Sequence, residues 1–399
     1  MYIKRRLTGL VESAAKQFPV ISLLGPRQSG KTTLAKKVFP KHKYISLEDL
    51  DQRAFAKNDP REFLKYAKNK NGVILDEIQH VLTILSYIQT EVDANRIPGY
   101  FVLTGSQNFL LNQALTQTLA GRMAVLKLMP LSIRELNDAK IKFNGIEELI
   151  YKGCYPIIYS QPTTVSMFYS SYVFTYIERD VQQVTDVGDL TQFRLFLKMC
   201  AGRIGQLLNV SQLANDCGLS LYKTERWLSL LQASYIIFLL QPHYKNFSKR
   251  LVKTPKLYFY DTGIASWLLD IESEEQLRTH YLKGGLTENL IITDFNKEYY
   301  NSGREPHTYF WRDNHGHELD CLLEKGEELY PIEIKSGYTI SQNYFSRLKY
   351  WNGLTNNNPE NGYVVYSGDE SQKRTFGNVI SWNHAYKIID NIYNKKHEQ

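Results

Sequence analysis

Short apolar runs alternate with longer stretches of helical spacing in the first third of the chain. The runs that indicate buried strands cover residues 20–24, 44–47, 73–75, 100–103 and 124–128. Because strands that alternate with helices form parallel sheets covered on both faces, this pattern predicts an α/β fold with a parallel sheet over residues 1–135.

The pattern turns helical from about residue 136 to 202, which we interpret as a helical lid. Residues 169–181 carry apolar side chains at helical spacing, and their aromatic stripe is more typical of packing than of a cofactor site. Residues 203–275 then predict a winged helix-turn-helix, with Ser220 as an N-cap and strands at residues 235–240 and 256–260. The side chains of its second helix that we expect to face the core are Leu221, Thr224, Leu228 and Leu231.

The last region, residues 276–399, mixes helices with strands whose apolar and polar side chains alternate. A helix begins near Gly285, and a second helix is expected near residues 341–351. The predicted strands cover residues 308–312, 317–324, 328–335 and 362–366. Alternation with a period of two indicates strands with one buried face, so this order of elements predicts a second α/β domain.

A glycine-rich loop with the pattern G-x-x-x-x-G-K-[ST] directly follows the first apolar run. It consists of Gly25, Pro26, Arg27, Gln28, Ser29, Gly30, Lys31 and Thr32, and Thr33 follows it. Such a loop lets backbone N–H groups approach phosphate oxygens at a helix N-terminus. We therefore expect Lys31 to reach the β- and γ-phosphates of a nucleoside triphosphate and Thr32 to hold Mg²⁺, with ATP and Mg²⁺ as the cofactors.

The apolar run at residues 73–75 ends in a pair of carboxylates, as a Walker B strand does. Asp76 is the candidate Mg²⁺ ligand, and Glu77 is the candidate base that polarises the attacking water. The plainer alternative for this pair is a solvated acidic strand end. Thr104 and Ser106, at the end of the fourth strand, are sensor candidates, although a turn that caps the next helix explains them equally well.

Composition places few limits on the function. The chain has 399 residues, 43% of them hydrophobic and 22% charged, which is typical of globular proteins and excludes disordered and fibrous classes. A formal net charge of +7 suits a phosphate-rich partner, but a bound nucleotide accounts for part of it. The four scattered cysteines indicate neither a disulfide framework nor a zinc site, and no run approaches a membrane span, so we expect a cytoplasmic protein.

The predicted winged helix offers a candidate DNA-contact surface. Tyr222, Lys223 and Arg226 would point away from the core, where a recognition helix presents its side chains. The loop between the two strands looks like a basic wing, with His243, Lys245, Lys249, Arg250 and Lys253. Cationic side chains there would neutralise DNA phosphates. Winged helices also serve as protein-contact modules, so DNA is one of two expected partners.

A second set of chemical side chains lies in the C-terminal region. Asp320 and the pair Glu333 and Lys335 form a D…E-x-K arrangement, in which the carboxylates hold Mg²⁺ and the lysine orients or deprotonates a water that attacks phosphorus. Glu288, on the helix that precedes these strands, is a further candidate ligand. The plainer alternative is a charged hairpin, which often carries such residues.

Several segments together resemble a known family. They are Gly25–Thr32, Leu75–Gln79, Leu103–Ser106, Gly121–Arg122, Pro130–Ser132, Arg179–Asp180 and Glu333–Lys335. Over nearly the whole chain they resemble the prokaryotic AAA+ ATPases that join a P-loop core of the additional-strand, catalytic-glutamate class to a winged helix and a C-terminal domain of unknown function. The resemblance implies a C-terminal domain similar to PD-(D/E)XK nucleases and ATP-dependent work on DNA.

Three functions compete at this stage. The first is an ATP-controlled, metal-dependent nuclease that acts on branched or end-bearing DNA, and the second is a nucleotide-gated signalling switch whose C-terminal domain only binds nucleic acid or protein. The third, a protein-remodelling machine, is less favoured because nothing resembles a pore loop. Arg122 and Arg179 are candidates for phosphate contact within one subunit or between subunits of a homo-oligomer, with solvated arginines as the alternative.

Overall fold

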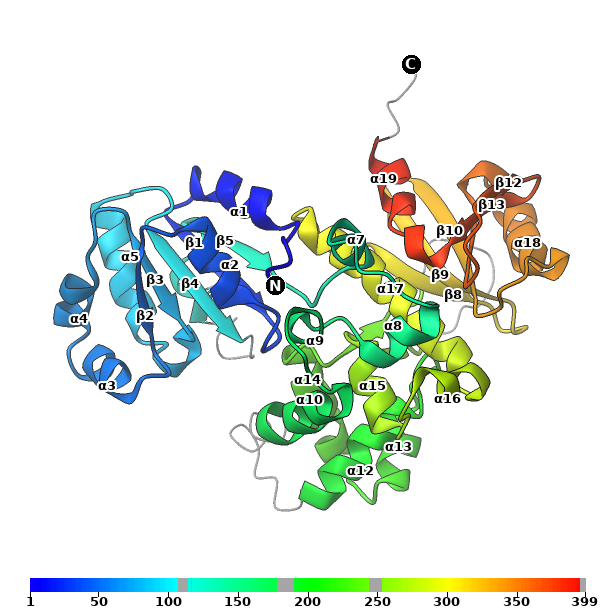
Figure 1. Cartoon of the computed structure of the whole chain (residues 1–399), viewed down its shortest axis with the longest axis horizontal. Helices are drawn as coiled ribbons and strands as arrows, with labels where there is room; N and C mark the ends of the chain where they lie inside the picture. The colour runs from blue at the N-terminus through cyan, green and yellow to red at the C-terminus, as the bar shows by residue number, and fades with distance from the viewer. Residues whose placement is uncertain (107–113, 116, 178–189, 244–252, 395–399) are drawn as a thin grey trace.

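The computed structural model describes residues 1–106, 114–115, 117–177, 190–243 and 253–394 (Figure 1). Within these residues the N-terminal region holds a five-stranded sheet in which every pairing is parallel. Its strands are β1 (Val20–Gly25), β2 (Lys43–Ser46), β3 (Val73–Asp76), β4 (Phe101–Ser106) and β5 (Met123–Lys127). The predicted parallel α/β sheet is therefore confirmed.

The strand order β2-β3-β4-β1-β5 decides which residues meet at the functional edge. β4 lies between β1 and β3 in the sheet, although β2 lies between them in the sequence. The register pairs Gly25 with Ser106 and Leu75 with Leu103. Because the strands are parallel, the glycine-rich loop, Asp76 and the end of β4 all lie at the carboxyl edge.

Alternating side chains of the sheet pack into two hydrophobic clusters, one on each face. Val20 and Leu24 of β1 point into one cluster, whereas Ile21 and Leu23 point into the other. The first cluster includes side chains from α4 (Pro60–Ala67) and α5 (Ile84–Ala94), next to α3 (Leu50–Asn58); the second includes side chains from α1 (Thr8–Ala15) and α2 (Lys31–Val38). Burial on both faces explains why the strands are almost wholly apolar.

The middle region is mainly helical. It comprises α7 (Ile133–Asp138), α8 (Ile146–Lys152), α9 (Pro156–Ser160), α10 (Val165–Tyr172), α12 (Leu190–Ala201), α13 (Val210–Asp216), α14 (Leu221–Ala233), the antiparallel strands β6 (Ile237–Leu240) and β7 (Lys256–Phe259), α15 (Thr262–Leu268) and α16 (Glu274–Thr279). The aromatic stripe packs internally, because Tyr169 and Tyr172 are buried against Tyr155.

The predicted helix-turn-helix corresponds to α13 and α14. Ser220 caps α14 by accepting a hydrogen bond from the backbone N–H of Lys223 at 3.2 Å. Thr224, Leu228 and Leu231 are buried as expected. Leu221 is not: it lies in the first turn of α14 and is 48% exposed, so the prediction that it faces the core was wrong.

The C-terminal region folds around α17 (Lys283–Asn301) and a sheet of order β12-β13-β11-β10-β9-β8. Its elements are β8 (Thr308–Arg312), β9 (Glu318–Lys325), β10 (Glu328–Lys335), α18 (Ser346–Thr355), β11 (Tyr363–Tyr366), β12 (Gln372–Arg374), β13 (Gly377–Ser381) and α19 (Lys387–Asn394). β8, β9 and β10 pair antiparallel, and β11 pairs parallel to β10. The predicted helices and strands are thus present in the predicted order.

α17 connects the regions of the molecule. It runs through the middle of the structure (Figure 1) and packs against β5, β7, β8 and β10. Its side chains join one continuous hydrophobic cluster that extends from Ile3 through the helical region to Ile392. Among the residues that the structure describes, no helix has the length and apolar character needed to cross a membrane.

Candidate nucleotide and carboxylate sites

The glycine-rich loop has the backbone geometry that its glycines allow. Gly25 has a φ of +150°, and a Cβ there would lie 2.2 Å from the carbonyl oxygen of Leu128. Gly30, the N-cap of α2, has a φ of +95°. Both values lie in a region that residues with a Cβ rarely adopt. The loop therefore requires glycine at these two positions, and it leads directly into the N-terminus of α2.

Lys31 folds back over this loop. Its side chain is buried, and Nζ donates hydrogen bonds to the carbonyl oxygens of Gly25 at 3.1 Å and Pro26 at 2.7 Å. A lysine held at the loop in this way needs only a rotation of its side chain to meet a phosphate. Its role in phosphate binding stays a prediction.

Asp76 is surrounded by hydroxyl donors. Thr32 Oγ1 lies 3.0 Å from each carboxylate oxygen, and Tyr44 OH donates to Oδ2 at 2.8 Å. Thr104 Oγ1 donates to Oδ1. Burial and the hydrogen bond to Asp76 raise the pKa of Tyr44. A threonine hydroxyl beside a carboxylate is a donor set that suits Mg²⁺, so Thr32 and Asp76 would hold the ion.

Glu77 occupies a strained turn directly after β3, with a φ of +56°. Its carboxylate accepts a hydrogen bond from Gln79 Nε2, which also donates to Ser106 Oγ at 3.0 Å. Ser106 thus reaches the Glu77 carboxylate through Gln79, whereas Thr104 contacts Asp76 itself. Sequence reasoning did not select Tyr44 or Gln79, because nothing in their spacing shows that they meet the two carboxylates.

Arg122 lies away from this edge. It directly precedes β5, and its carbonyl oxygen accepts from the backbone N–H of Val20 at 3.3 Å, so it sits at the amino edge of the parallel sheet. Its guanidinium pairs with Asp93 at 2.5 and 2.8 Å. The structure therefore does not bring Arg122 to the loop of its own chain.

Arg5 is a buried residue that sequence reasoning missed. Its guanidinium donates to the carbonyl oxygens of Ser29 and Met129 at 2.6 Å each and pairs with Glu135 at 3.0 Å. Glu135 belongs to the capping box of α7, together with Ser132. Arg5 therefore ties the glycine-rich loop to the first helix of the middle region.

The candidate DNA-contact residues are partly described. Tyr222 is 72% exposed, and Arg226 is exposed, as predicted for the outer face of α14. Lys223 is less exposed than predicted: its side chain is half-buried, and its Nζ donates to Gln192 Oε1 at 3.1 Å. Lys245, Lys249 and Arg250 lie outside the described residues, as does Arg179. His243, which we expected in the exposed basic wing, is instead buried beside Glu324, because its segment packs against β8.

The C-terminal carboxylates meet as predicted. Lys335 Nζ lies 2.5 Å from Glu333 Oε2 and 3.5 Å from Asp320 Oδ2. Asp320 Oδ2 also accepts from the backbone N–H of Ile334 at 2.8 Å. Burial, followed by the charge of Asp320, raises the pKa of Glu333 to about 8. Glu333 Oε1 is buried and has no hydrogen-bond partner among the described residues, so Asp320 and Glu333 fit a divalent cation.

Two cations that the sequence analysis did not select complete this carboxylate site. Arg347 of α18 lies 2.9 Å from Asp320 Oδ1 and 3.5 Å from Glu333 Oε2. Lys256 of β7 is buried and contacts Glu288 at 2.9 Å and Glu318 at 2.6 Å. Glu288 therefore lies near the site but pairs with Lys256, and burial raises its pKa.

Comparison with known protein families gives three matches along the chain. Residues 17–137 match an AAA domain, residues 144–275 match a domain of unknown function, DUF8612, and residues 283–385 match another, DUF4143. The first match covers the sheet, the glycine-rich loop and the acidic pair. The N-terminal region is thus similar to AAA domains, and this similarity supports ATP binding and hydrolysis.

Two curated relatives match most of the chain. They are uncharacterised proteins of Mycobacterium tuberculosis and Mycobacterium bovis, each 27% identical over 348 residues, which cover 86% of this chain and 76% of the relative. Solved structures with similarity include a Walker-type ATPase of Pyrococcus abyssi, with 15% identity, a TM-score of 0.40 and coverage of 67% of this chain and 96% of that one. A RuvB variant of Thermotoga maritima has 17% identity, a TM-score of 0.31 and coverage of 59% and 88%. Likenesses this distant assign no function.

Proposed function

We propose that this chain hydrolyses ATP at the glycine-rich loop and uses that turnover to control metal-dependent cleavage of DNA at the C-terminal carboxylate site. The observation that supports cleavage at this site is the convergence of Asp320, Glu333 and Lys335, together with the buried Oε1 of Glu333, which has no hydrogen-bond partner in the part of the chain that the structure describes. We further propose that the chain has four functional units, which cover residues 1–135, 136–202, 203–275 and 276–399.

At the nucleotide site, each described side chain has a distinct task. Lys31 would leave the carbonyl oxygens of its loop and neutralise the β- and γ-phosphates. Thr32 and Asp76 would hold Mg²⁺, which offsets the charge that develops on the phosphate oxygens. Glu77 would accept a proton from the attacking water, and Thr104 and Ser106 would position Asp76 and, through Gln79, Glu77.

At the carboxylate site, Asp320 and Glu333 would hold a divalent cation, which activates water and stabilises the charge on the scissile phosphate. Lys335 contacts both carboxylates. Burial lowers the pKa of Lys335, but the charges of Asp320 and Glu333 outweigh this effect and raise it, so Lys335 would orient the attacking water as an ammonium rather than deprotonate it. Glu288 would join as a ligand only after it leaves Lys256. Glu333 carries a raised pKa in this structure, so binding of the cation would displace its proton.

A continuous set of contacts connects the two sites. Arg5 joins the carbonyl oxygen of Ser29 to Glu135 of α7, and the backbone N–H of Ile133 in α7 donates to Asp294 of α17 at 2.7 Å. Arg134 of α7 also pairs with Glu298 of α17 at 3.2 Å. α17 carries Glu288, so a shift of the loop on nucleotide binding has a route to the carboxylates.

Tyr222 and Arg226 support a nucleic-acid partner, because both are exposed near the start of α14, the second helix of the helix-turn-helix. An arginine can neutralise a phosphate and an exposed tyrosine can stack on a base. Lys245, Lys249 and Arg250 extend this proposal as candidate contacts. A homo-oligomer in which Arg122 or Arg179 serves a neighbouring subunit is part of the same proposal.

The second candidate function is a nucleotide-gated switch without cleavage. One observation favours it: Arg347 and Lys335 already neutralise Asp320 and Glu333, and Lys256 holds Glu288. A carboxylate site closed by its own cations has no need of a metal. In that case the C-terminal region would bind nucleic acid or protein according to the nucleotide state.

One experiment separates the two candidates. Intact protein and the variants Lys31→Ala, Glu77→Gln and Asp320→Ala are incubated with single-stranded, duplex and branched DNA, with and without ATP, in Mg²⁺ or Mn²⁺. The nuclease proposal predicts cleavage that Asp320→Ala abolishes and that Lys31→Ala or Glu77→Gln alters. Cleavage that persists in Asp320→Ala contradicts the assignment, and DNA binding without cleavage by any form supports the switch.

A further inference from the structure

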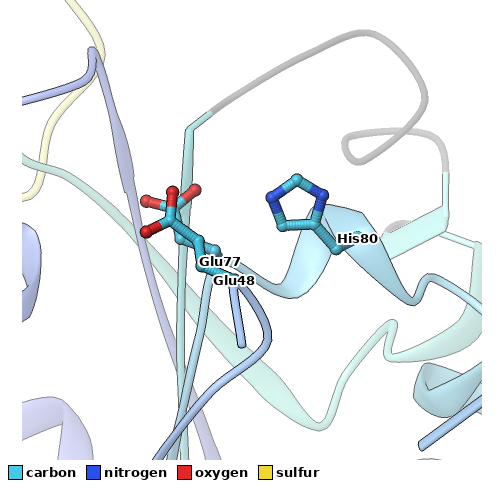
Figure 2. Close-up of side chains that lie close together, drawn as sticks. All are labelled: Glu48, Glu77 and His80. Atoms are coloured by element: carbon cyan, nitrogen blue, oxygen red, sulfur yellow. The ribbon is translucent and has the colours of Figure 1, made fainter. Parts of the chain in front are cut away.

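Three side chains beside the nucleotide site form a cluster that the proposed hydrolysis does not use as a unit. Glu48, Glu77 and His80 each place a carboxylate oxygen or an imidazole nitrogen within 4.8 Å of the other two (Figure 2). The geometry points to a binding site for a zinc-class transition-metal ion that captures the Glu77 carboxylate and thereby stops hydrolysis. This inference rests on the proposed role of Glu77 as the base.

The backbone creates this cluster. β2 and β3 are paired in parallel with Ser46 opposite Asp76, so the segments that follow both strands leave the sheet side by side. Glu48 lies on the first segment and Glu77 on the second. After the left-handed turn at Glu77, a short 3₁₀ helix over Ile78–His80 brings the imidazole of His80 to the side where the two carboxylates lie. Figure 2 shows the two carboxylates together and the imidazole facing them.

The donor set selects the kind of metal. Imidazole suits Zn²⁺ and neighbouring transition metals, whereas Mg²⁺ takes oxygen ligands and keeps much of its water. In a tetrahedral zinc site, bonds of about 2.0–2.2 Å bring neighbouring ligand atoms to roughly 3.3 Å of each other. The ligand atoms of the cluster lie within 4.8 Å of one another, so they have to come closer to reach this spacing. The Glu48 side chain is 61% exposed and can rotate to bring its carboxylate nearer to the other two ligands. Arg27, whose guanidinium lies 3.9 Å from Glu48, would give up this weak contact.

The consequence for the nucleotide site is specific. Gln79 holds Oε2 of Glu77, so the other oxygen would be the ligand atom. A carboxylate bound to a metal ion cannot accept a proton from the attacking water. Lys31 and Thr32 are outside the cluster, so ATP would still bind. A zinc-class ion would therefore trap the ATP-bound state rather than empty the site.

Binding is tested first, on the nucleotide-free 399-residue chain, by calorimetric titration with Zn²⁺. The comparison uses His80→Gln, Glu48→Gln and the matched control His315→Gln, which removes an exposed imidazole in the C-terminal region. Loss of one ligand should weaken the tightest Zn²⁺ site at least about tenfold, since even supporting residues of metal sites have effects of that size. His315→Gln should bind as the wild type does. Unchanged tight binding by His80→Gln contradicts the site.

Inhibition is tested second, as ATP hydrolysis in saturating Mg²⁺ and ATP at buffered concentrations of free Zn²⁺. Each variant is compared with its own rate in Mg²⁺ without added Zn²⁺. Zn²⁺ should lower the rate of the wild type and of His315→Gln but have a much smaller effect on His80→Gln. Tight Zn²⁺ binding that leaves wild-type hydrolysis unchanged contradicts the inhibitory role. If the wild type hydrolyses no ATP, the proposed function fails, while calorimetry still decides whether the metal site exists.

Discussion

At the scale of single residues, the main feature of the nucleotide site is that Asp76 is held in place by neutral donors. Thr32, Tyr44 and Thr104 all donate to its carboxylate. Hydroxyl groups orient a carboxylate without neutralising its charge, so it can still bind a cation. Glu77, by contrast, accepts a side-chain hydrogen bond only from the amide of Gln79 among the described residues, and it sits in a strained turn. The two adjacent carboxylates therefore differ in how firmly they are held, which suits a fixed metal ligand and a base that has to act.

The first prediction concerns Glu77. The variant Glu77→Gln keeps the size of the side chain but cannot accept a proton, so ATP hydrolysis should fall by roughly 10²–10⁴-fold. ATP affinity should stay within a few-fold of the wild type because Lys31 and Thr32 are intact. Steady-state phosphate release and nucleotide binding measure the two quantities separately. Glu12→Gln, an exposed carboxylate on α1, is the matched control, and equal rates for Glu77→Gln and this control would contradict the assignment.

At the scale of elements, buried ion pairs tie the glycine-rich loop to α7 and α7 to α17. Arg5 is almost fully buried between Ser29 and Glu135. The variant Arg5→Met leaves the Glu135 carboxylate buried without its cation, and breaking such a pair destabilises a protein by about 3–5 kcal/mol. Thermal unfolding should show a clearly lower midpoint than in Arg61→Met, which removes an exposed arginine of α4.

Arg5→Lys extends this test, because it keeps the charge but not the planar geometry that serves three acceptors at once. We expect an intermediate midpoint. A midpoint for Arg5→Met equal to that of Arg61→Met would show that the pair does not hold these elements together.

The contact between α7 and α17 should respond to pH. Burial raises the pKa of Asp294 to about 6, and burial together with the charge of Asp294 raises the pKa of Glu298 to about 7. A carboxyl whose pKa is raised on folding stabilises the protein fully below its ordinary value and loses that contribution as pH rises through the raised value. The temperature at the midpoint of unfolding should therefore decrease as the pH rises from about 4 to about 7.

Asp294→Asn should flatten this dependence, because the amide keeps an acceptor for the backbone N–H of Ile133 and cannot ionise. The exposed carboxylate variant Glu12→Asn serves as the control. A pH profile of Asp294→Asn that matches the wild type would mean that this pair does not titrate with folding.

Much of the element order was predictable, because it depends on local patterns. Continuous apolar runs marked β1 and β3, and the placement of Asp76 and Glu77 followed from the end of β3. The position of Arg122 could also have been derived, since a residue that precedes a parallel strand lies at the amino edge. The contacts of Arg347 and Lys256 could not be derived from the sequence. Each of these side chains meets carboxylates that are distant in the sequence, and only the packing of whole elements brings them together.

At the scale of the whole molecule, two charged sites lie on different sheets and share α17 between them. The nucleotide site belongs to the N-terminal parallel sheet, and the carboxylate site belongs to β9 and β10 of the C-terminal sheet. α17 packs against strands of both sheets and continues one hydrophobic core. The parallel sheet has two hydrophobic clusters of its own, so the packing of α17 against β5 and the ion pair between Arg134 of α7 and Glu298 of α17 are the contacts through which nucleotide state and carboxylate site should respond to each other.

The carboxylate site gives a prediction at this scale. Arg347→Met removes the cation that lies 2.9 Å from Asp320 and 3.5 Å from Glu333. Less competition for the two carboxylates should tighten Mn²⁺ binding severalfold, as measured by the paramagnetic resonance signal of free Mn²⁺. Lys349→Met, on an exposed part of α18, is the control. Weaker or unchanged Mn²⁺ binding in Arg347→Met would argue that Arg347 does not occupy a metal position.

ATP binding to the intact chain is the most direct test of the central claim that the glycine-rich loop holds a triphosphate. Isothermal titration calorimetry in the presence of Mg²⁺ should show ATP binding by the wild type and its loss, or a large weakening, in Lys31→Ala. The control is Lys37→Ala, which removes an exposed lysine of α2 and should bind as the wild type does. Absence of binding by the wild type, or equal affinity in Lys31→Ala, would contradict the account.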